Sequence, residues 1–146
     1  MHKIYNFFFI ILLLILPFPA NSHVSHYDNL NRIEFDIFRN NKNIGKHIFS
    51  FKRQENKLFV DSEINFEIKK LGIVLYKYHV KGTEIYEDGK LIKFNSKTDQ
   101  NGKKKFVNME LSEDGEFNID GSSYQGKAIT DFVLGTWWNH SIVEAP

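Results

Sequence analysis

The chain has 146 residues, enough for one domain of ordinary size behind an N-terminal leader. Its 19 basic and 18 acidic residues nearly balance, so nothing in the composition argues for an anionic membrane surface as partner, and we expect no nucleic acid partner. The sequence has no Cys, so a disulfide framework is excluded and the core alone must hold the fold. Its 14 Phe and 6 Tyr suit a β-rich core.

The N-terminus has the pattern of a secretory signal peptide. Lys3 precedes an apolar run from Phe7 to Leu16, which is too short to span a bilayer. The small residues of Ala20-Asn21-Ser22 favour cleavage before His23, and an uncleaved membrane anchor is the alternative. We therefore expect residues 1–22 to be a signal peptide, residues 23–31 to be an N-terminal tail, and the protein to be periplasmic or secreted.

From Arg32 onward, apolar and polar residues alternate with a period of two between turn sequences. This predicts one all-β domain over residues 32–146, an antiparallel meander of about seven or more strands. The apolar positions are Ile33, Phe35, Ile37, Phe49, Phe51, Leu58, Val60, Ile64, Phe66, Ile68, Tyr76, Tyr78, Val80, Ile92, Phe94, Val107, Met109, Leu111, Phe117 and Ile119. A sheet with one apolar face must curl and be covered, so we expect a half-barrel or an incomplete barrel.

The turn sequences predict how the strands pair. Asn101-Gly102 is typical of a two-residue type I′ hairpin turn, because both positions need a positive φ. Such a turn places Ser96 opposite Val107, Phe94 opposite Met109 and Ile92 opposite Leu111. Apolar residues then face apolar residues, as a one-sided sheet requires.

Asp88-Gly89 has a similar sequence, but a two-residue loop there turns Ile92 and Phe94 to the polar side. We therefore expect a three-residue loop, Glu87-Asp88-Gly89, with Gly89 in the left-handed conformation. Glu84 then faces Ile92, Gly82 faces Phe94 and Val80 faces Ser96. Glu113-Asp114-Gly115 predicts the same turn, with Gly115 left-handed, Leu111 opposite Phe117 and Met109 opposite Ile119.

The segment from Ala128 to Trp138 is compatible with a short helix over the concave face or with a further strand. We favour a loop that leads into a strand from Trp137 to Val143.

Glu84 stands out because it shares a strand face with aromatic and β-branched residues. Its neighbours on that face are Tyr76, Tyr78, Val80, Gly82 and Tyr86. An unpaired carboxylate there costs several kcal/mol and has a raised pKa. Two interpretations stay open: Glu84 anchors a ligand, or it is a structural residue held by Tyr or Thr hydroxyls, a cation or water.

Other polar residues on the same face join Glu84 as candidate ligand-binding residues. Ser62, Ser96 and Thr98 would form a polar floor in an apolar groove, or they are small residues tolerated beside bulky ones. The remaining candidates are Tyr76, Tyr78, Phe94, His47 and Trp138. His47 lies two residues before Phe49 and four before Phe51, so its side chain is expected on the same, concave face. Contact with Glu84 there would allow acid–base chemistry. No nucleophile motif is present, and we assign no catalytic residue.

No motif predicts a cofactor or a structural metal. The only histidine cluster is His23-Val24-Ser25-His26 at the expected mature N-terminus, where a disordered tail is the simpler interpretation. Cleavage after Ala20 would create Asn-Ser-His, a potential Cu(II) ligand set. Zinc spacing and an acidic calcium loop are absent from the sequence. Lys103-Lys104-Lys105 is typical of a solvated hairpin end.

Several short motifs occur in a recognisable order. They are Asn41-Lys42-Asn43-Ile44-Gly45-Lys46-His47, Leu71-Gly72 before Tyr76 and Tyr78, Glu84, Asp88-Gly89-Lys90-Leu91, Ser96-Lys97-Thr98-Asp99-Gln100-Asn101-Gly102 and Trp138-Asn139. In this order the sequence resembles a family of secreted Gram-negative bacterial proteins known only as a domain of unknown function. The family pattern has Trp where this chain has Tyr86, and it continues past Trp-Asn with more strands, which predicts a shortened chain with an open sheet edge.

The resemblance implies a periplasmic β-sheet protein, distantly similar in shape to half-barrel lipoprotein carriers, and it implies no activity. We expect a binding protein that holds a lipid or another apolar molecule on the concave face of the sheet. The alternative is an envelope interaction module that works through a sheet edge and the pair Trp137-Trp138. A hydrolase-type enzyme that uses Glu84 with His47 or Asp99 is the least favoured reading.

Overall fold

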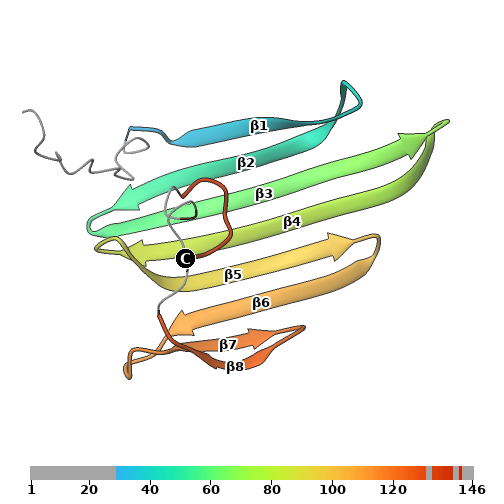
Figure 1. Ribbon diagram of the computed structural model, residues 1–146. Coiled ribbons are helices and arrows are strands. Elements are labelled where there is room, and N and C mark those ends of the chain that lie inside the picture. The colour runs from blue at the N-terminus through green and yellow to red at the C-terminus, as the bar shows by residue number, and fades with distance from the viewer. Residues whose placement is uncertain (1–28, 131–132, 140–141, 143–146) are drawn as a thin grey trace, which may run out of the picture.

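The protein forms one sheet of eight antiparallel strands, each hydrogen-bonded to its neighbours in sequence (Figure 1). The computed structural model describes residues 29–130, 133–139 and 142. The strands are β1 (Arg32–Arg39), β2 (Lys42–Gln54), β3 (Lys57–Lys70), β4 (Ile73–Glu87), β5 (Lys90–Gln100), β6 (Lys103–Leu111), β7 (Phe117–Gly121) and β8 (Gln125–Ala128). The predicted all-β meander is therefore confirmed.

The sheet is curled but not closed, because β1 and β8 each have one neighbouring strand. Within the described ranges there is no α-helix. It follows that none of these residues forms a helix long and apolar enough to cross a membrane. The predicted signal peptide, the histidine cluster and most of the predicted tail lie outside the described residues.

Two of the predicted hairpins are confirmed. Asn101 and Gly102 have φ angles of 51° and 82°, and Ser96 pairs with Val107 and Phe94 with Met109. In the next hairpin Leu111 pairs with Phe117 and Met109 with Ile119, and Gly115 has a φ of 82°. The ladder between β5 and β6 has the predicted register but begins at Lys93 and Glu110, one residue short of the expected pair of Ile92 with Leu111.

The predicted three-residue loop at Glu87-Asp88-Gly89 is also wrong. Asp88 and Gly89, with φ angles of 49° and 78°, form a two-residue turn, so Glu87 pairs with Lys90. A β-bulge then leaves Ile92 without a partner in β4. The extra residue restores the alternation, so Glu84 pairs with Phe94, Gly82 with Ser96 and Val80 with Thr98. Glu84 and Phe94 still share one face, as expected.

The same device recurs in two other hairpins. The two-residue turns are Asn40-Asn41 in β1–β2 and Leu71-Gly72 in β3–β4, and the unpaired residues are Ile44 and Leu75. In all three hairpins the bulged residue is Ile or Leu and lies three positions after the turn. The bulge lets a tight turn close each hairpin while the apolar side chains stay on one side of the sheet.

The two faces of the sheet differ in chemistry. One face, called here the apolar face, carries Phe49, Val60, Glu84, Phe94 and Met109 and their alternating neighbours. The opposite face, called the polar face, is crossed by exposed ion pairs such as Lys93–Glu110 at 3.0 Å. Pairs of this kind in water add little to stability, so burial on the apolar face must supply most of it.

The C-terminal segment 133–139 covers one end of the apolar face (Figure 1). Its Trp138 joins the buried cluster Phe49, Phe51, Val60 and Tyr86. The predicted strand from Trp137 to Val143 is wrong where the structure describes it, because residues 137–138 form a turn and residue 142 lies in a short 3₁₀ turn. The eighth strand, β8, was not predicted.

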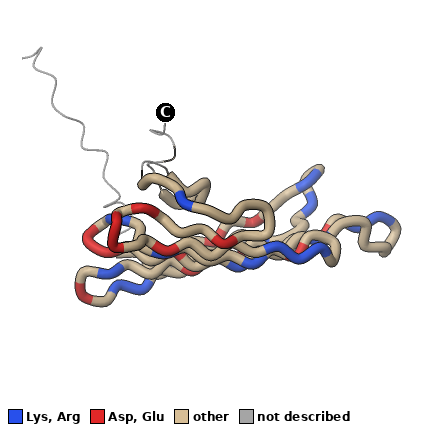
Figure 2. Tube along the Cα trace, turned by 90° about the horizontal axis from the view of Figure 1, so that it is seen from below, with Lys and Arg blue, Asp and Glu red and all other residues tan. Residues whose placement is uncertain are grey.

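Charge divides along the strands. Figure 2 shows acidic residues gathered towards one end of the sheet, where basic residues also occur, and basic residues predominating at the other end. The acidic end consists of the turns that carry Glu55, Glu87, Asp88, Glu113, Asp114 and Glu116. The basic end consists of the hairpins that carry Arg39, Lys42, Lys69, Lys70, Lys103 and Lys104.

Candidate functional site

Glu84 lies on a central strand of the sheet, towards the acidic end, in a row that runs from Phe51 through Val60 and Glu84 to Phe94 and Met109. Its side chain is fully buried, with a relative exposure of 0 %. The alternation of β4 directs it to the apolar face, and Trp138 of the C-terminal segment lies over it. A carboxyl group in such a place needs hydrogen-bond donors from the fold or from a ligand.

The fold supplies those donors. The Tyr86 hydroxyl donates to Glu84 Oε2 at 2.6 Å. The Trp138 indole N–H lies 3.2 Å from Oε1 and 3.1 Å from Oε2, so it donates between the two oxygens. One donor lies two residues along the same strand, and the other lies 54 residues further along the chain. No Lys or Arg forms an ion pair with Glu84 in the described part of the chain.

Thr136 and Asn139 complete the surroundings. The Thr136 hydroxyl is buried without a hydrogen bond of ordinary geometry, yet it is near enough to Glu84 to favour the charged carboxylate. Asn139 interacts with the Tyr86 hydroxyl. Three side chains of the segment 133–139 therefore surround Glu84 and Tyr86 of β4.

Burial dominates the electrostatics of this pair. Desolvation raises the pKa of Glu84, and the hydrogen bonds from Tyr86, Trp138 and Thr136 oppose the rise only in part. Burial also raises the pKa of Tyr86, and the adjacent carboxylate raises it further. Tyr86 therefore stays protonated and remains a donor.

Aromatic packing fixes the Trp138 ring over the carboxyl group. Its centroid is 5.4 Å from that of Phe51 and 5.7 Å from that of Tyr86, and both contacts are edge-to-face. Trp138 is 3 % exposed, whereas the adjacent Trp137 is 75 % exposed. The predicted Trp pair is thus split between core and surface.

Of the residues expected to form a polar floor, Ser62 and Ser96 share a row with Gly82, and Thr98 lies in the next row, opposite Val80. Ser62, Gly82 and Ser96 pair directly across β3, β4 and β5, between Phe49 and Val107. A Cβ atom at Gly82 would lie 2.9 Å from the Ser62 hydroxyl oxygen and 3.7 Å from the Phe94 ring. The Phe94 ring therefore leans over Gly82, and the floor is partly filled by protein.

His47 and Glu84 do not meet. His47 shares a row with Ile64, Val80 and Thr98, and Glu84 is four residues further along β4 than Val80. At about 3.3 Å per residue and about 4.8 Å per strand, they are offset by about 13 Å along the strands and about 10 Å across them. Burial lowers the pKa of His47, whose ring packs 4.2 Å from that of Phe49. Asp99 pairs with His79 on the polar face.

The open end of the apolar face carries an aromatic array formed by Phe66, Tyr76 and Tyr78. The Phe66 centroid is 5.9 Å from that of Tyr76 and 5.3 Å from that of Tyr78. The two Tyr rings stack 6.5 Å apart with planes inclined by 10°. All three side chains are only partly buried, and none contacts the buried cluster under Trp138. A set of half-exposed rings on a sheet face is a feature of ligand and partner surfaces.

A cavity of about 520 Å³ lies on the apolar side, where the C-terminal segment meets the acidic end. Tyr86, Leu91, Phe117, Val133 and Asn139 line it, among others. It has the size of a small-molecule pocket. It is close to the expected site, because Tyr86 holds Glu84, but Tyr78, Phe94 and Trp138 do not line it.

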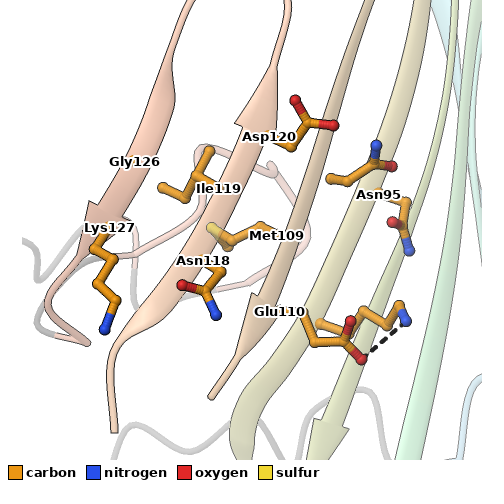
Figure 3. Close-up of a pocket in the computed structure, with 10 residues that line it drawn as sticks. Asn95, Met109, Glu110, Asn118, Ile119, Asp120, Gly126 and Lys127 are labelled. Carbon is orange, nitrogen blue, oxygen red and sulfur yellow. Dashed lines mark hydrogen bonds and ion pairs between the residues drawn. The ribbon is translucent and has the colours of Figure 1, made fainter. Parts of the chain in front are cut away.

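A second hollow, of about 560 Å³, lies over strands β5 to β8 (Figure 3). Glu110, Asn118 and Lys127 come from three adjacent strands that place them in one row, and the dashed line marks the Lys93–Glu110 pair. Amides and charged groups dominate its lining, as on any solvated strand face. We assign it no ligand.

Sequence reasoning missed two features. Thr136 and Asn139 belong to the Glu84 surroundings, and their only sequence signal is proximity to Trp138. The His79 Nε2–H donates a 2.7 Å hydrogen bond to Glu63 Oε1 on the polar face, and this bond lowers the pKa of Glu63.

Across the described residues, no three His, Asp or Glu side chains gather closely enough to hold a metal ion.

Comparison with known proteins gives a family and no activity. A search of curated proteins and a search of solved structures each found no match. A family model described as "Domain of unknown function (DUF6134)" matches residues 35–146, which is most of the chain and nearly all of the sheet. The resemblance drawn from the ordered motifs is confirmed to that extent, and the chain belongs to this family of domains of unknown function.

Proposed function

We propose that the protein is a non-enzymatic binding protein, exported from the cytoplasm, that holds an apolar or amphiphilic molecule on the apolar face of its sheet. The observation that carries the proposal is the aromatic array of Phe66, Tyr76 and Tyr78 at the open end of that face. The described covering segment lies at the other end, over Glu84. Apolar rings left half-exposed in this way favour an apolar occupant.

Polar groups beside the array favour an amphiphile over a pure hydrocarbon. Tyr78 and Gln100 lie in the same row as Phe66, and Tyr76 and Thr98 lie in the rows on either side. Ser62 and Ser96 lie one row beyond Thr98. A few placed polar groups in an apolar surface orient a ligand and select its head group. Glu84 is not part of this surface, because its hydrogen-bond donors come from Tyr86 and Trp138.

The direct test is chemical analysis of the purified protein. Extraction with organic solvent followed by mass spectrometry should release a bound amphiphile. Titration with N-phenyl-1-naphthylamine, a neutral apolar dye, should show enhanced fluorescence, and Tyr78→Ser should weaken its binding about tenfold through lost apolar contact. A dye that binds wild type and Tyr78→Ser equally, together with an extract free of amphiphile, would refute the proposal.

Phe106→Ser provides the matched control. Phe106 is an exposed ring, 39 % accessible, and it pairs with Lys97 on the polar face. Its loss should leave dye binding unchanged. Equal weakening by Phe106→Ser and Tyr78→Ser would show that the dye reports general surface hydrophobicity.

An interaction module remains the second candidate, and the exposure of Trp137 favours it. Trp137 is 75 % exposed, and Phe38, next to the β1–β2 turn, is 62 % exposed. Exposed Trp is enriched in protein interfaces. Crosslinking in cells should recover a partner that Trp137→Ala loses. Trp138→Ala is unsuitable for this test, because Trp138 belongs to the core.

A further inference from the structure

The β3–β4 hairpin ends in an apolar tip. Leu71 in its turn is 93 % exposed, and Ile73, Val74 and Leu75 behind it are 66 %, 46 % and 55 % exposed. The hairpin reaches beyond its neighbours at that end of the sheet (Figure 1). Four successive exposed aliphatic positions around one turn form an apolar patch of the kind that marks an interaction site.

Leu71 is also conformationally out of place. It has a φ of 52° in a two-residue turn, where Asn, Asp and Gly are favoured and an aliphatic side chain is strained. The corresponding residues of the other two-residue turns are Asn40, Glu55, Asp88 and Asn101, all of them polar. The Leu71 side chain therefore stabilises the fold neither through a favoured backbone conformation nor through burial. This indicates that the side chain makes a contact outside the chain.

Cationic side chains surround this tip. Lys69 and Lys70 precede the turn, and Arg39, Lys42, Lys103 and Lys104 occupy the adjacent hairpins of the basic end (Figure 2). Glu67 pairs with Lys69 at 2.8 Å and with Lys77 at 3.6 Å. Within the described residues no ion pair engages Lys70, Lys103 or Lys104. The basic end thus carries an excess of positive charge beside an exposed aliphatic tip.

We propose that the basic end docks on an anionic phospholipid bilayer, with Leu71 inserted among the lipid chains and the lysines against the head groups. Charge complementarity selects this occupant: basic residues attract anionic lipid, and an apolar residue among them gains by entering the interface. The acidic end faces away from such a surface, so the molecule would bind in one orientation. The inference is independent of the ligand proposed above.

A site-specific probe gives the sharpest test, because the sequence has no Cys. A nitrobenzoxadiazole label is attached to a Leu71→Cys variant of the full chain and, as control, to Glu113→Cys at the acidic end. Adding phosphatidylglycerol vesicles should shift the label at position 71 to shorter wavelength and leave the label at position 113 unchanged. Phosphatidylcholine vesicles should shift neither label. No shift at position 71 with anionic vesicles, or equal shifts at both positions, would overturn the proposal.

The contribution of charge is tested at both ends. Replacing Lys70, Lys103 and Lys104 by Gln in the labelled Leu71→Cys background should raise the vesicle concentration needed for the shift about fivefold for each lysine removed. Replacing Lys52, Lys57 and Lys90 by Gln removes the same charge near the acidic end and should have little effect. High salt should abolish the difference. Equal weakening by the two triple variants would overturn the proposal.

The apolar contribution is tested by Leu71→Asn in the unlabelled chain. Asn suits the turn better, so far-ultraviolet circular dichroism and the Tm should be unchanged or improved. Co-sedimentation with phosphatidylglycerol vesicles, corrected for phosphatidylcholine, should nevertheless fall about tenfold. Unchanged sedimentation of this variant would overturn the proposal.

Discussion

The Tyr86 hydroxyl donates a 2.6 Å hydrogen bond to the carboxyl group of Glu84, two residues earlier on the same strand. Residues two apart on a strand project to the same side, so β4 alone brings this donor to the acceptor. The arrangement explains how a carboxyl group is tolerated on the apolar face without a neighbouring cation. Trp138 closes it from above and so ties the C-terminal segment to the sheet.

Tyr86→Phe should destabilise the fold by about 2 kcal/mol, because it removes a hydrogen bond to a buried carboxyl group and retains the ring. The free energy of unfolding in urea is the measurement. Tyr78→Phe is the control, since Tyr78 lies in the half-exposed array, and it should change stability by less than about 0.5 kcal/mol. Equal changes in the free energy of unfolding would show that the Tyr86 hydrogen bond does not stabilise the fold.

Glu84→Gln should make stability less dependent on pH. The folded state raises the pKa of Glu84 above its ordinary value of 4.5, so the folded protein binds this proton more tightly than the unfolded chain. Glu84 therefore lowers stability as pH rises from about 4.5 through the raised pKa, and the loss is constant above it. Gln carries no such dependence.

The measurement is the difference in unfolding free energy between wild type and Glu84→Gln, followed from pH 4 upward. The advantage of wild type should be largest at acid pH and should shrink as pH rises. Other groups contribute equally to both proteins and cancel in this difference. Glu63 is an example, because the His79 bond lowers its pKa and its contribution to stability therefore rises with pH. A difference independent of pH would contradict the raised pKa.

Trp138→Phe should cost about 2 to 4 kcal/mol, because it loses the indole N–H bond to Glu84 and part of the contact with Phe51 and Tyr86. Trp137→Phe, at an exposed position, should cost less than about 0.5 kcal/mol. Acrylamide quenching separates the two residues spectroscopically. In Trp137→Phe the remaining fluorescence comes from the buried Trp138 and should resist quenching. In Trp138→Phe it comes from the exposed Trp137 and should be quenched readily.

Gly45→Ala should destabilise the protein by about 3 kcal/mol, because a Cβ there would meet the Asn65 carbonyl oxygen at 2.1 Å and the Phe66 Cβ at 2.4 Å. Gly45 directly follows the bulged Ile44 and pairs with Phe66 of β3. Gly135→Ala is the control, since no atom lies within 4 Å of its added Cβ. Thermal melting of both variants checks the prediction, and a Gly45→Ala protein as stable as wild type would contradict it.

The alternation of apolar residues was sufficient to predict the sheet, its meander order and the face on which Glu84 lies. The failure at Asp88-Gly89 was one of register alone. A two-residue turn with a bulge at Ile92 and a three-residue loop give the same parity, so parity cannot separate them. The recurrence of Ile or Leu three positions after each such turn was visible in the sequence and would have resolved the ambiguity.

The C-terminal segment could not be predicted in the same way. Residues 133–139 have no periodicity, and their conformation follows from packing on a sheet assembled from distant parts of the chain. Total charge does not reveal how charge is distributed. Acidic residues gather in the turns at one end of the sheet, with Lys57 and Lys90 among them, and the hairpins at the other end are mainly basic. Which turns share an end depends on the strand topology.

The sequence by itself determined strands β1 to β7, their order and the two faces, because side-chain alternation and turn chemistry are local properties. It also required a hydrogen-bond donor for the Glu84 carboxyl group on the apolar face. Only the tertiary structure decided that Tyr86 and Trp138 do so, since the indole comes from 54 residues further along the chain. The same holds for the open aromatic array and the basic hairpin end, which exist only once neighbouring strands bring their side chains together.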